Sequence, residues 1–303
     1  MAWSVQRKPE MTCLIPPSFR HGNRVGWLSL LLLCLVLTAG CSRTRIAYNF
    51  SDWFLLHRID HYFDLTREQE RFLSARVSAL QAWHRQHELP RLVAALGELE
   101  RRYQDGLSAE DIEWVWAQQA TFWQRLIARG LPDFAEFLTM LQPEQIRHLQ
   151  NRFQNGGGWL VKQAALDEAE LARDHGEWLR EVLEDWYGGL DADQAASLPG
   201  ELRADAGWVK LRLANRHRFQ QNFLELVQAG GSPDGLHQRL SLWLQHPETR
   251  WLPGFEERLE ARRRQWQRWM VRVDAMMSPA QRRHALERIR GYRLDFETLV
   301  EEG

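Results

Sequence analysis

The sequence contains little cysteine and little lysine. Only three of its 303 residues are cysteines, Cys13, Cys34 and Cys41. A fold stapled by disulfides is therefore excluded for the part of the chain after residue 40, where Cys41 stands alone. Lysine occurs three times, yet 39 basic side chains face 40 acidic ones and the formal net charge is −1. This balance gives no case for nucleic acid as a partner.

The sequence also lacks the short motifs that mark common active sites. It holds no HExxH motif, no CxxC pair and no nucleophile elbow. Gly156-Gly157-Gly158 lacks the lysine and the strand context that a phosphate-binding loop needs. We therefore favour a protein that is not an enzyme, and we expect no cofactor.

An apolar run near the N-terminus ends at Leu37-Thr38-Ala39-Gly40-Cys41. Basic residues precede the run, residues 27–37 carry no charge, and small residues stand directly before Cys41. This order is typical of a lipoprotein signal peptide, so we predict a signal over residues 1–40 and acylation of Cys41. The alternatives are a membrane-spanning helix, for which residues 25–40 fall short of roughly 20 residues, and ordinary secretion.

The rest of the chain has a helical pattern throughout. Apolar residues recur every three or four positions and no stretch alternates with period two. We predict an all-α domain over residues 51–303 with ten or eleven helices and no β-sheet, after a short lead-in over residues 41–50. It is either one helical bundle or two packed lobes that meet near residues 156–158. Thirteen tryptophans fall after residue 40, and we interpret them as packing residues.

Glycine and proline set the expected helix ends. A helix that begins at Ser108 is predicted to end at Gly130, with a separate short helix over residues 134–140. One uninterrupted helix is predicted over residues 159–187, and another over residues 201–229.

A helix-start signature recurs five times. A polar residue that can cap a helix follows an apolar one, and three residues later a Gln or Asp can reach back to the cap. The copies are spaced irregularly, so they do not form a solenoid repeat. The five copies are Leu65-Thr66-Arg67-Glu68-Gln69, Leu107-Ser108-Ala109-Glu110-Asp111, Leu141-Gln142-Pro143-Glu144-Gln145, Leu190-Asp191-Ala192-Asp193-Gln194 and Met277-Ser278-Pro279-Ala280-Gln281.

Two resemblances follow from these motifs. The helix-start signature is similar to the LTxxQ motif of small periplasmic stress chaperones. Ala47-Tyr48-Asn49, Asp52-Trp53, Trp83-His84-Arg85 and Leu89-Pro90, together with the signal, resemble an uncharacterised family of helical lipoproteins of Gram-negative bacteria. This resemblance implies an all-helical lipoprotein without an assigned activity. Ser42 after the cysteine resembles the sorting pattern that directs lipoproteins to the outer membrane.

A group of histidines and aspartates in the first predicted helical hairpin is the best candidate for chemistry. Asp60 and Asp64 lie one helical turn apart, and either could orient His84 if the two helices pack together. His57, His61, His84 and His87 are candidate metal ligands in the same region. Three interpretations stay open: a buried hydrogen-bond network, a metal site, or acid–base catalysis by His84 with Asp60 or Asp64.

Arginine dominates the two C-terminal helices. Between Phe255 and Arg293 there are 11 arginines and five acidic residues. Such a face could bind an anionic ligand, or it could be a solvated surface that is paired with acids elsewhere. The anionic-ligand candidates are Arg262, Arg263, Arg264, Arg268 and Arg272.

These observations lead to two functional expectations. The first is a lipid-anchored binding, scaffold or chaperone-like module on the periplasmic face of the outer membrane. Its partners would be the membrane, through its N-terminal lipid, and an envelope protein or anionic envelope polymer. The alternative is a metal-binding protein or a hydrolase-like enzyme that uses the histidine and aspartate group.

Overall fold

The computed structural model describes residues 43–156, 158–197, 202 and 204–302, and these residues form helices and their connections without any strand. The predicted all-α class is confirmed. The first helices are α2 (Arg43–Asn49), α3 (Ser51–Phe63), α4 (Arg67–Trp83), a π-helical turn η1 (His84–Glu88), α5 (Leu89–Arg102), a 3₁₀ turn η2 (Tyr103–Asp105), α6 (Ala109–Thr139) and α7 (Pro143–Asn155). The chain continues with α8 (Trp159–Ala165), α9 (Glu168–Tyr187), α10 (Ala192–Ser197), α11 (Ala206–Gln228), α12 (Pro233–Gln245), η3 (Pro247–Arg250), α13 (Phe255–Met276) and α14 (Pro279–Glu301).

Three predicted helix boundaries are wrong. Helix α6 continues through Gly130 and Pro132 to Thr139, so the separate helix over residues 134–140 does not exist. A proline inside a helix removes one hydrogen bond, but Ala135 and Phe137 are fully buried in the core on the far side of it. That packing outweighs the local cost.

The helix predicted over residues 159–187 is divided into α8 and α9. Asp167 starts α9, because its side chain accepts from the amide of Glu170 at 2.8 Å and the Glu170 carboxylate accepts from the amide of Asp167. This capping box lies within an otherwise helical pattern, where the apolar spacing conceals it. Helix α11 begins at Ala206 rather than near residue 201, and Asp205 caps it.

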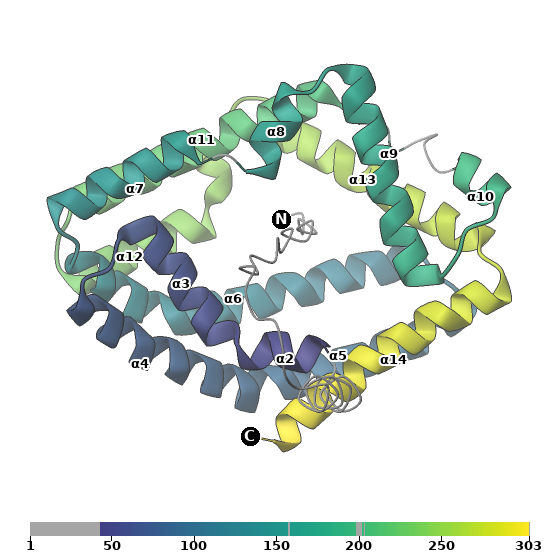
Figure 1. The fold of residues 1–303 in the computed structure, drawn as a ribbon, viewed down its shortest axis with the longest axis horizontal. Coiled ribbons are helices and arrows are strands. Elements are labelled where there is room, and N and C mark those ends of the chain that lie inside the picture. Colours follow the sequence, from purple (N-terminus) through teal and green to yellow (C-terminus); the bar gives the residue numbers. More distant parts are fainter. Residues whose placement is uncertain (1–42, 157, 198–201, 203, 303) are drawn as a thin grey trace, which may run out of the picture. The chain divides into compact units, whose positions relative to one another are not determined.

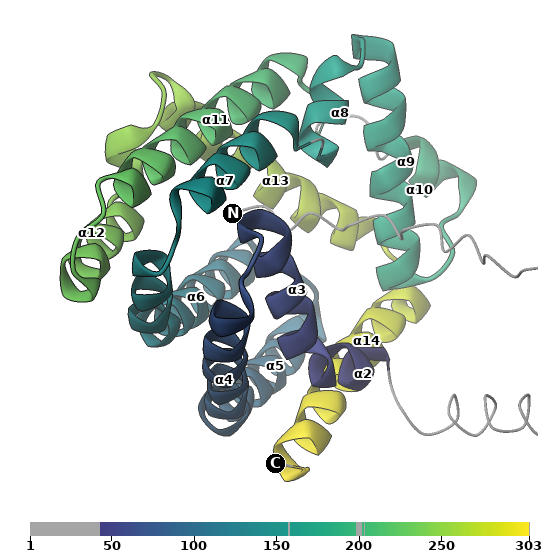
Figure 2. The same cartoon turned by 60° about the vertical axis from the view of Figure 1, so that its left-hand side comes forward.

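Three apolar clusters hold residues 43–303 together as one compact unit. The largest cluster joins α3, α4, α6, α7, α11 and α12 around Phe63, Leu73 and Phe137. A second cluster lies between α9 and α13, and a third joins α5 to α14. The pairs α3 with α4, α6 with α12 and α5 with α14 pack side by side (Figures 1 and 2).

The helix-start signatures do more than cap helices, because their glutamines pair with one another. Gln69 at the start of α4 and Gln145 at the start of α7 are buried, and their side-chain amides donate to each other at 2.9 and 2.7 Å. Each oxygen also accepts from the backbone amide of its own helix cap. Gln69 Nε2 donates further to the carbonyl of Met140, and Gln145 Nε2 to that of Asp64.

A second glutamine pair repeats this arrangement in the C-terminal half. Gln194 at the start of α10 and Gln281 at the start of α14 donate to each other at 2.9 Å in both directions. Gln194 Nε2 donates to the carbonyl of Met276, and Gln281 Nε2 to that of Gly189. In both pairs each glutamine reaches the carbonyl five residues before its partner. The same local motif therefore builds the same tertiary joint twice.

Candidate functional site

Two motifs that lie far apart in the sequence meet where α2 packs near the end of α4. The hydroxyl of Tyr48 lies 3.1 Å from Nδ1 of His84, and Arg85 donates to the side chain of Asn49 at 2.6 Å. The Arg85 guanidinium also lies over the Tyr48 ring, 5.3 Å from its centre. Gln81 donates to the carbonyl of Tyr48 and to the hydroxyl of Ser51. This polar network joins the segments 47–49 and 83–85.

Burial sets the protonation state of the network. It lowers the pKa of His84, although Glu88 opposes the shift, and it raises the pKa of Tyr48, where the charge of Arg85 opposes it. At neutral pH His84 is therefore an uncharged imidazole beside a protonated phenol. A neutral pair of this kind suits a structural hydrogen bond.

The structure does not bring Asp60 and Asp64 to His84. Asp60 accepts from the backbone amide of Leu65 at 3.0 Å, and Asp64 ends α3 with a φ of 52°. Both lie at the α3–α4 turn, whereas His84 follows the last residue of α4. At about 1.5 Å per residue, the length of α4 separates them by about 25 Å.

The histidine candidates for metal binding also have separate surroundings. His57 stacks on Trp53, and His87 lies 3.1 Å from the carbonyl of Trp83. His61 contacts Arg152. Within the described ranges, no three His, Cys, Asp or Glu side chains converge in a way that could hold a metal ion.

Glu88, a residue that the sequence did not single out, is a buried charge four residues after His84. It is 2% exposed and its carboxylate binds Arg125 through two nitrogens at 2.8 and 2.9 Å, and Arg91 at 2.6 Å. Burial raises the pKa of Glu88, but the two guanidinium groups outweigh it and hold the pKa below its ordinary value. The π-helical turn directs the Glu88 side chain into the protein interior. The regular α-helical spacing of the sequence gives no sign of this turn, so it did not predict the burial of Glu88.

The arginine-rich C-terminal helices divide into separate environments. Arg263 pairs with Glu113 at 3.1 Å and lies over the ring of Trp116, and Arg264 lies 4.0 Å from Glu260. Arg268 and Arg272 are exposed. Arg262 is the one of the five candidates that lines a cavity.

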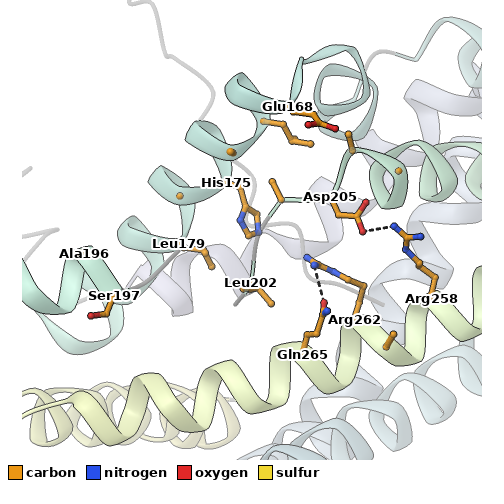
Figure 3. A pocket seen from close by; sticks show the side chains of 17 residues that line it. Glu168, His175, Leu179, Ala196, Ser197, Leu202, Asp205, Arg258, Arg262 and Gln265 are labelled. Atoms are coloured by element: carbon orange, nitrogen blue, oxygen red, sulfur yellow. Dashed lines mark hydrogen bonds and ion pairs between the residues drawn. The ribbon is translucent and has the colours of Figure 1, made fainter. Parts of the chain in front are cut away.

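The cavity has a volume of about 1140 Å³ and lies between α9, α13 and the segment that leads into α11 (Figure 3). Leu171, Ala172, Leu179 and Leu202 give it apolar walls. Its polar side chains come from four elements. They are Glu168 and His175 on α9, Ser197 on α10, Asp205 before α11, and Arg258, Arg262 and Gln265 on α13.

Charge in the cavity is arranged around Asp205. This carboxylate caps α11 by accepting from the amide of Trp208 at 2.8 Å, and it pairs with Arg258 at 2.6 Å. Arg262 donates to Gln265 at 3.1 Å. Burial and the charge of Arg262 together lower the pKa of His175 to about 4, and the charge of Asp174 opposes them. His175 is therefore neutral at pH 7, and the cavity presents two guanidinium groups and two carboxylates, those of Asp205 and Glu168.

A second buried polar group joins α9 and α13 to the segment that contains η2. Asp274 is 2% exposed and accepts from the hydroxyl groups of Tyr103 and Tyr187 and from the backbone amide of Leu107. Burial and this carboxylate raise the pKa of Tyr103. A side chain at Gly106, whose φ is 97°, would come within 2.9 Å of the same carboxylate. Asp274 therefore joins η2, α9 and α13.

The described residues form an all-helical domain with a lined cavity and paired helix starts. A family model described as a family of unknown function, DUF6279, matches residues 61–256. Because the match spans more than half of the chain, the protein belongs to this family. Neither curated proteins nor solved structures gave a match.

The family match covers Trp83-His84-Arg85 and Leu89-Pro90, but the segment 47–53 and the predicted lipobox precede it. Cys41 and the predicted signal lie outside the described residues. Among the helices of the described part, none combines the length and the apolar character needed to cross a bilayer.

Proposed function

We propose that this protein is a lipid-anchored, non-enzymatic binding protein on the periplasmic face of the outer membrane. The order of charge, apolar run and small residues before Cys41 supports the anchor. An acyl chain stabilises membrane binding by about 0.8 kcal/mol per buried methylene, and the several chains of a lipoprotein hold it firmly. Ser42 favours the outer membrane by its resemblance to the sorting pattern.

The cavity between α9 and α13 supports the binding role. Its walls are apolar, and Arg258 and Arg262 stand at one side of it (Figure 3). An apolar cavity with a few convergent polar groups is the usual form of a small-molecule site. Guanidinium groups bind carboxylates and phosphates through directed hydrogen bonds. The ligand class that matches both features is an anionic amphiphile, such as a fatty acid or a phospholipid fragment.

The protonation states favour binding over acid–base chemistry. A general base works best when its pKa lies near the working pH, whereas the pKa of His175 is held at about 4. Asp205 is engaged by Arg258 and by the start of α11. Arg262 and Gln265, which are hydrogen-bonded to each other, carry groups suited to recognition.

A fluorescence titration with cis-parinarate, a carboxylate with an apolar chain, tests this role. The fragment 43–303 contains all three apolar clusters and serves as the protein. We expect saturable binding that dodecanoate competes for and dodecanol does not. Arg262→Gln removes one charged hydrogen bond, worth about 1.5 kcal/mol, and should weaken binding about tenfold.

Arg264→Gln is the matched control, because it removes the same charge from the same helix outside the cavity. It should leave the affinity unchanged. Absence of saturable binding, or equal loss in both variants, would contradict the proposal.

A further inference from the structure

The first two helices carry an unusual set of exposed apolar side chains. Ile46 is 45% exposed, and Phe50, Trp53 and Phe54 are each 57% exposed. With about 200 Å² for each aromatic side chain, the three aromatic residues leave roughly 350 Å² uncovered. Patches of about 300–600 Å² are the largest on a typical monomer and are often functional. We call these four residues the aromatic face.

The aromatic face lies on one side of the chain. Helical hydrogen bonds continue through the junction, since the amide of Phe50 donates to the carbonyl of Ile46 and that of Phe54 to the carbonyl of Phe50. Residues 46, 50 and 54 are therefore one turn apart, and Trp53 lies next to them. The opposite side of α3 packs into the largest cluster through Leu56, Ile59 and Phe63. Helix α3 thus carries apolar side chains on both sides, but only one of these sides packs against the core.

The charges at the ends of the aromatic face are basic. Arg43 starts α2 and Arg58 lies beyond Phe54, and both are exposed. Asp52 accepts from the amide of Trp53 at 2.7 Å and is directed to the start of α3. Tryptophan and phenylalanine next to arginine are the side chains that occupy the boundary between headgroups and acyl chains.

The aromatic face follows closely after the predicted lipid attachment site, and this closeness indicates which surface covers it. The apolar run of residues 25–40 ends directly before Cys41, and only Ser42 stands between Cys41 and Arg43. Two residues span at most about 7 Å. A membrane that holds Cys41 therefore lies within about 7 Å of the start of α2, which makes it the surface nearest to the aromatic face along the chain.

The face is also fixed to the body of the protein. Gln81 and Arg85 bind the backbone and side chains of residues 48–51, and Arg45 pairs with Glu302 at 3.4 Å. Helix α2 lies beside α14 (Figures 1 and 2), and its Tyr48 and Asn49 contact η1. Any surface that holds the aromatic face must therefore hold the whole helical unit in one orientation.

We propose that the aromatic face inserts into the boundary between headgroups and acyl chains of the membrane, beside the N-terminal anchor, and orients the helical unit on its surface. This proposal rests on the anchor of the proposed function and is independent of the cavity. It also explains why Trp53 departs from the packing role expected of the tryptophans.

Site-specific labelling of the full-length chain tests the proposal. The chain is produced in a Gram-negative host with Cys13 and Cys34 changed to Ser, isolated from membranes, and reconstituted into vesicles of phosphatidylethanolamine and phosphatidylglycerol. Phe54→Cys carries the fluorophore NBD. Leu242→Cys on α12 is the matched control, because Leu242 is 58% exposed and belongs to another element.

We expect both labelled proteins to float with the vesicles. The label at residue 54 should emit at shorter wavelength, and nitroxide lipids should quench it several-fold more than the label at residue 242. Flotation with equal access of aqueous iodide to both labels would overturn the membrane contact while the anchor stands. A label at residue 54 that is shielded from iodide but not quenched by nitroxide lipids would overturn it in favour of a protein partner or second copy. Failure to float would refute the anchor and the contact together.

Discussion

Gln69 and Gln145 form a buried, reciprocal amide pair across 76 residues of sequence. Each side chain also accepts from its own helix cap and donates to a backbone carbonyl beside the partner helix, so both amides use all their hydrogen bonds. Gln194 and Gln281 repeat the arrangement. The two side chains that complete the caps of α4 and α7 also bind each other. The pair therefore links the start of each helix to the contact between the two helices.

Replacing Gln69 by Ala should destabilise the protein strongly. The change removes the donor to the carbonyl of Met140, the acceptor of the Thr66 amide and both hydrogen bonds with Gln145, at a cost of about 3 kcal/mol in the free energy of unfolding. Gln104→Ala is the control, since Gln104 is exposed and bonds only within its own turn, and it should cost less than about 0.5 kcal/mol. Urea unfolding measures both. A cost for Gln69→Ala no greater than that of the control would show that the joint is not formed.

Glu88→Gln should also lower stability, because it removes the charge that Arg125 and Arg91 share. Breaking a buried ion pair on one side costs about 3 kcal/mol. Glu144→Gln is the control, since Glu144 is exposed and pairs only with Arg147 three residues away. Thermal unfolding at constant pH compares the two variants. Equal midpoints for the two variants would exclude the proposed role of Glu88.

Acidification should destabilise the protein through His175. Its pKa is about 4 in the folded protein and 6.5 in the unfolded chain. The unfolded chain therefore binds a proton first as the pH falls, so stability is complete above pH 6.5 and declines toward pH 4. At pH 5 this amounts to about 2 kcal/mol.

The measurement is the free energy of unfolding in urea at pH 7 and pH 5. His175→Gln should lose less stability between the two pH values than the wild type, by about 2 kcal/mol. His246→Gln, at an exposed position, should behave like the wild type. His84 shifts stability in the same direction, so part of the pH dependence should remain in His175→Gln. An unchanged pH dependence in that variant would contradict the assignment.

The fold could be predicted from the sequence where local chemistry decides it. Thr66, Ser108 and Ser278 cap the helices they were expected to cap. Predictions from neighbouring residues were wrong or incomplete where contacts between distant segments determine the structure. Pro132 lies inside α6 because packing in the core outweighs it, and nothing near Gln69 in the sequence indicates that Gln145 is its partner.

The candidate sites were predictable only in part. The sequence predicted that Asp60 or Asp64 could orient His84, but the hydrogen-bond partner of His84 is Tyr48. The length of a helix separates the aspartates from His84, which residue spacing along a hairpin does not reveal. Arg262 was among the anionic-ligand candidates, whereas His175, Asp205 and Arg258 were not. Those three come from separate helices that only the tertiary fold brings together.

The anchor is the central claim, since it determines where any ligand or partner is met. Incorporation of labelled palmitate into the full-length chain in a Gram-negative host, followed by separation of the membranes, tests it most directly. We expect the wild type to carry palmitate and to sediment with the outer membrane, and Cys41→Ala to carry none. Palmitate on Cys41→Ala, or none on the wild type, would contradict acylation at Cys41.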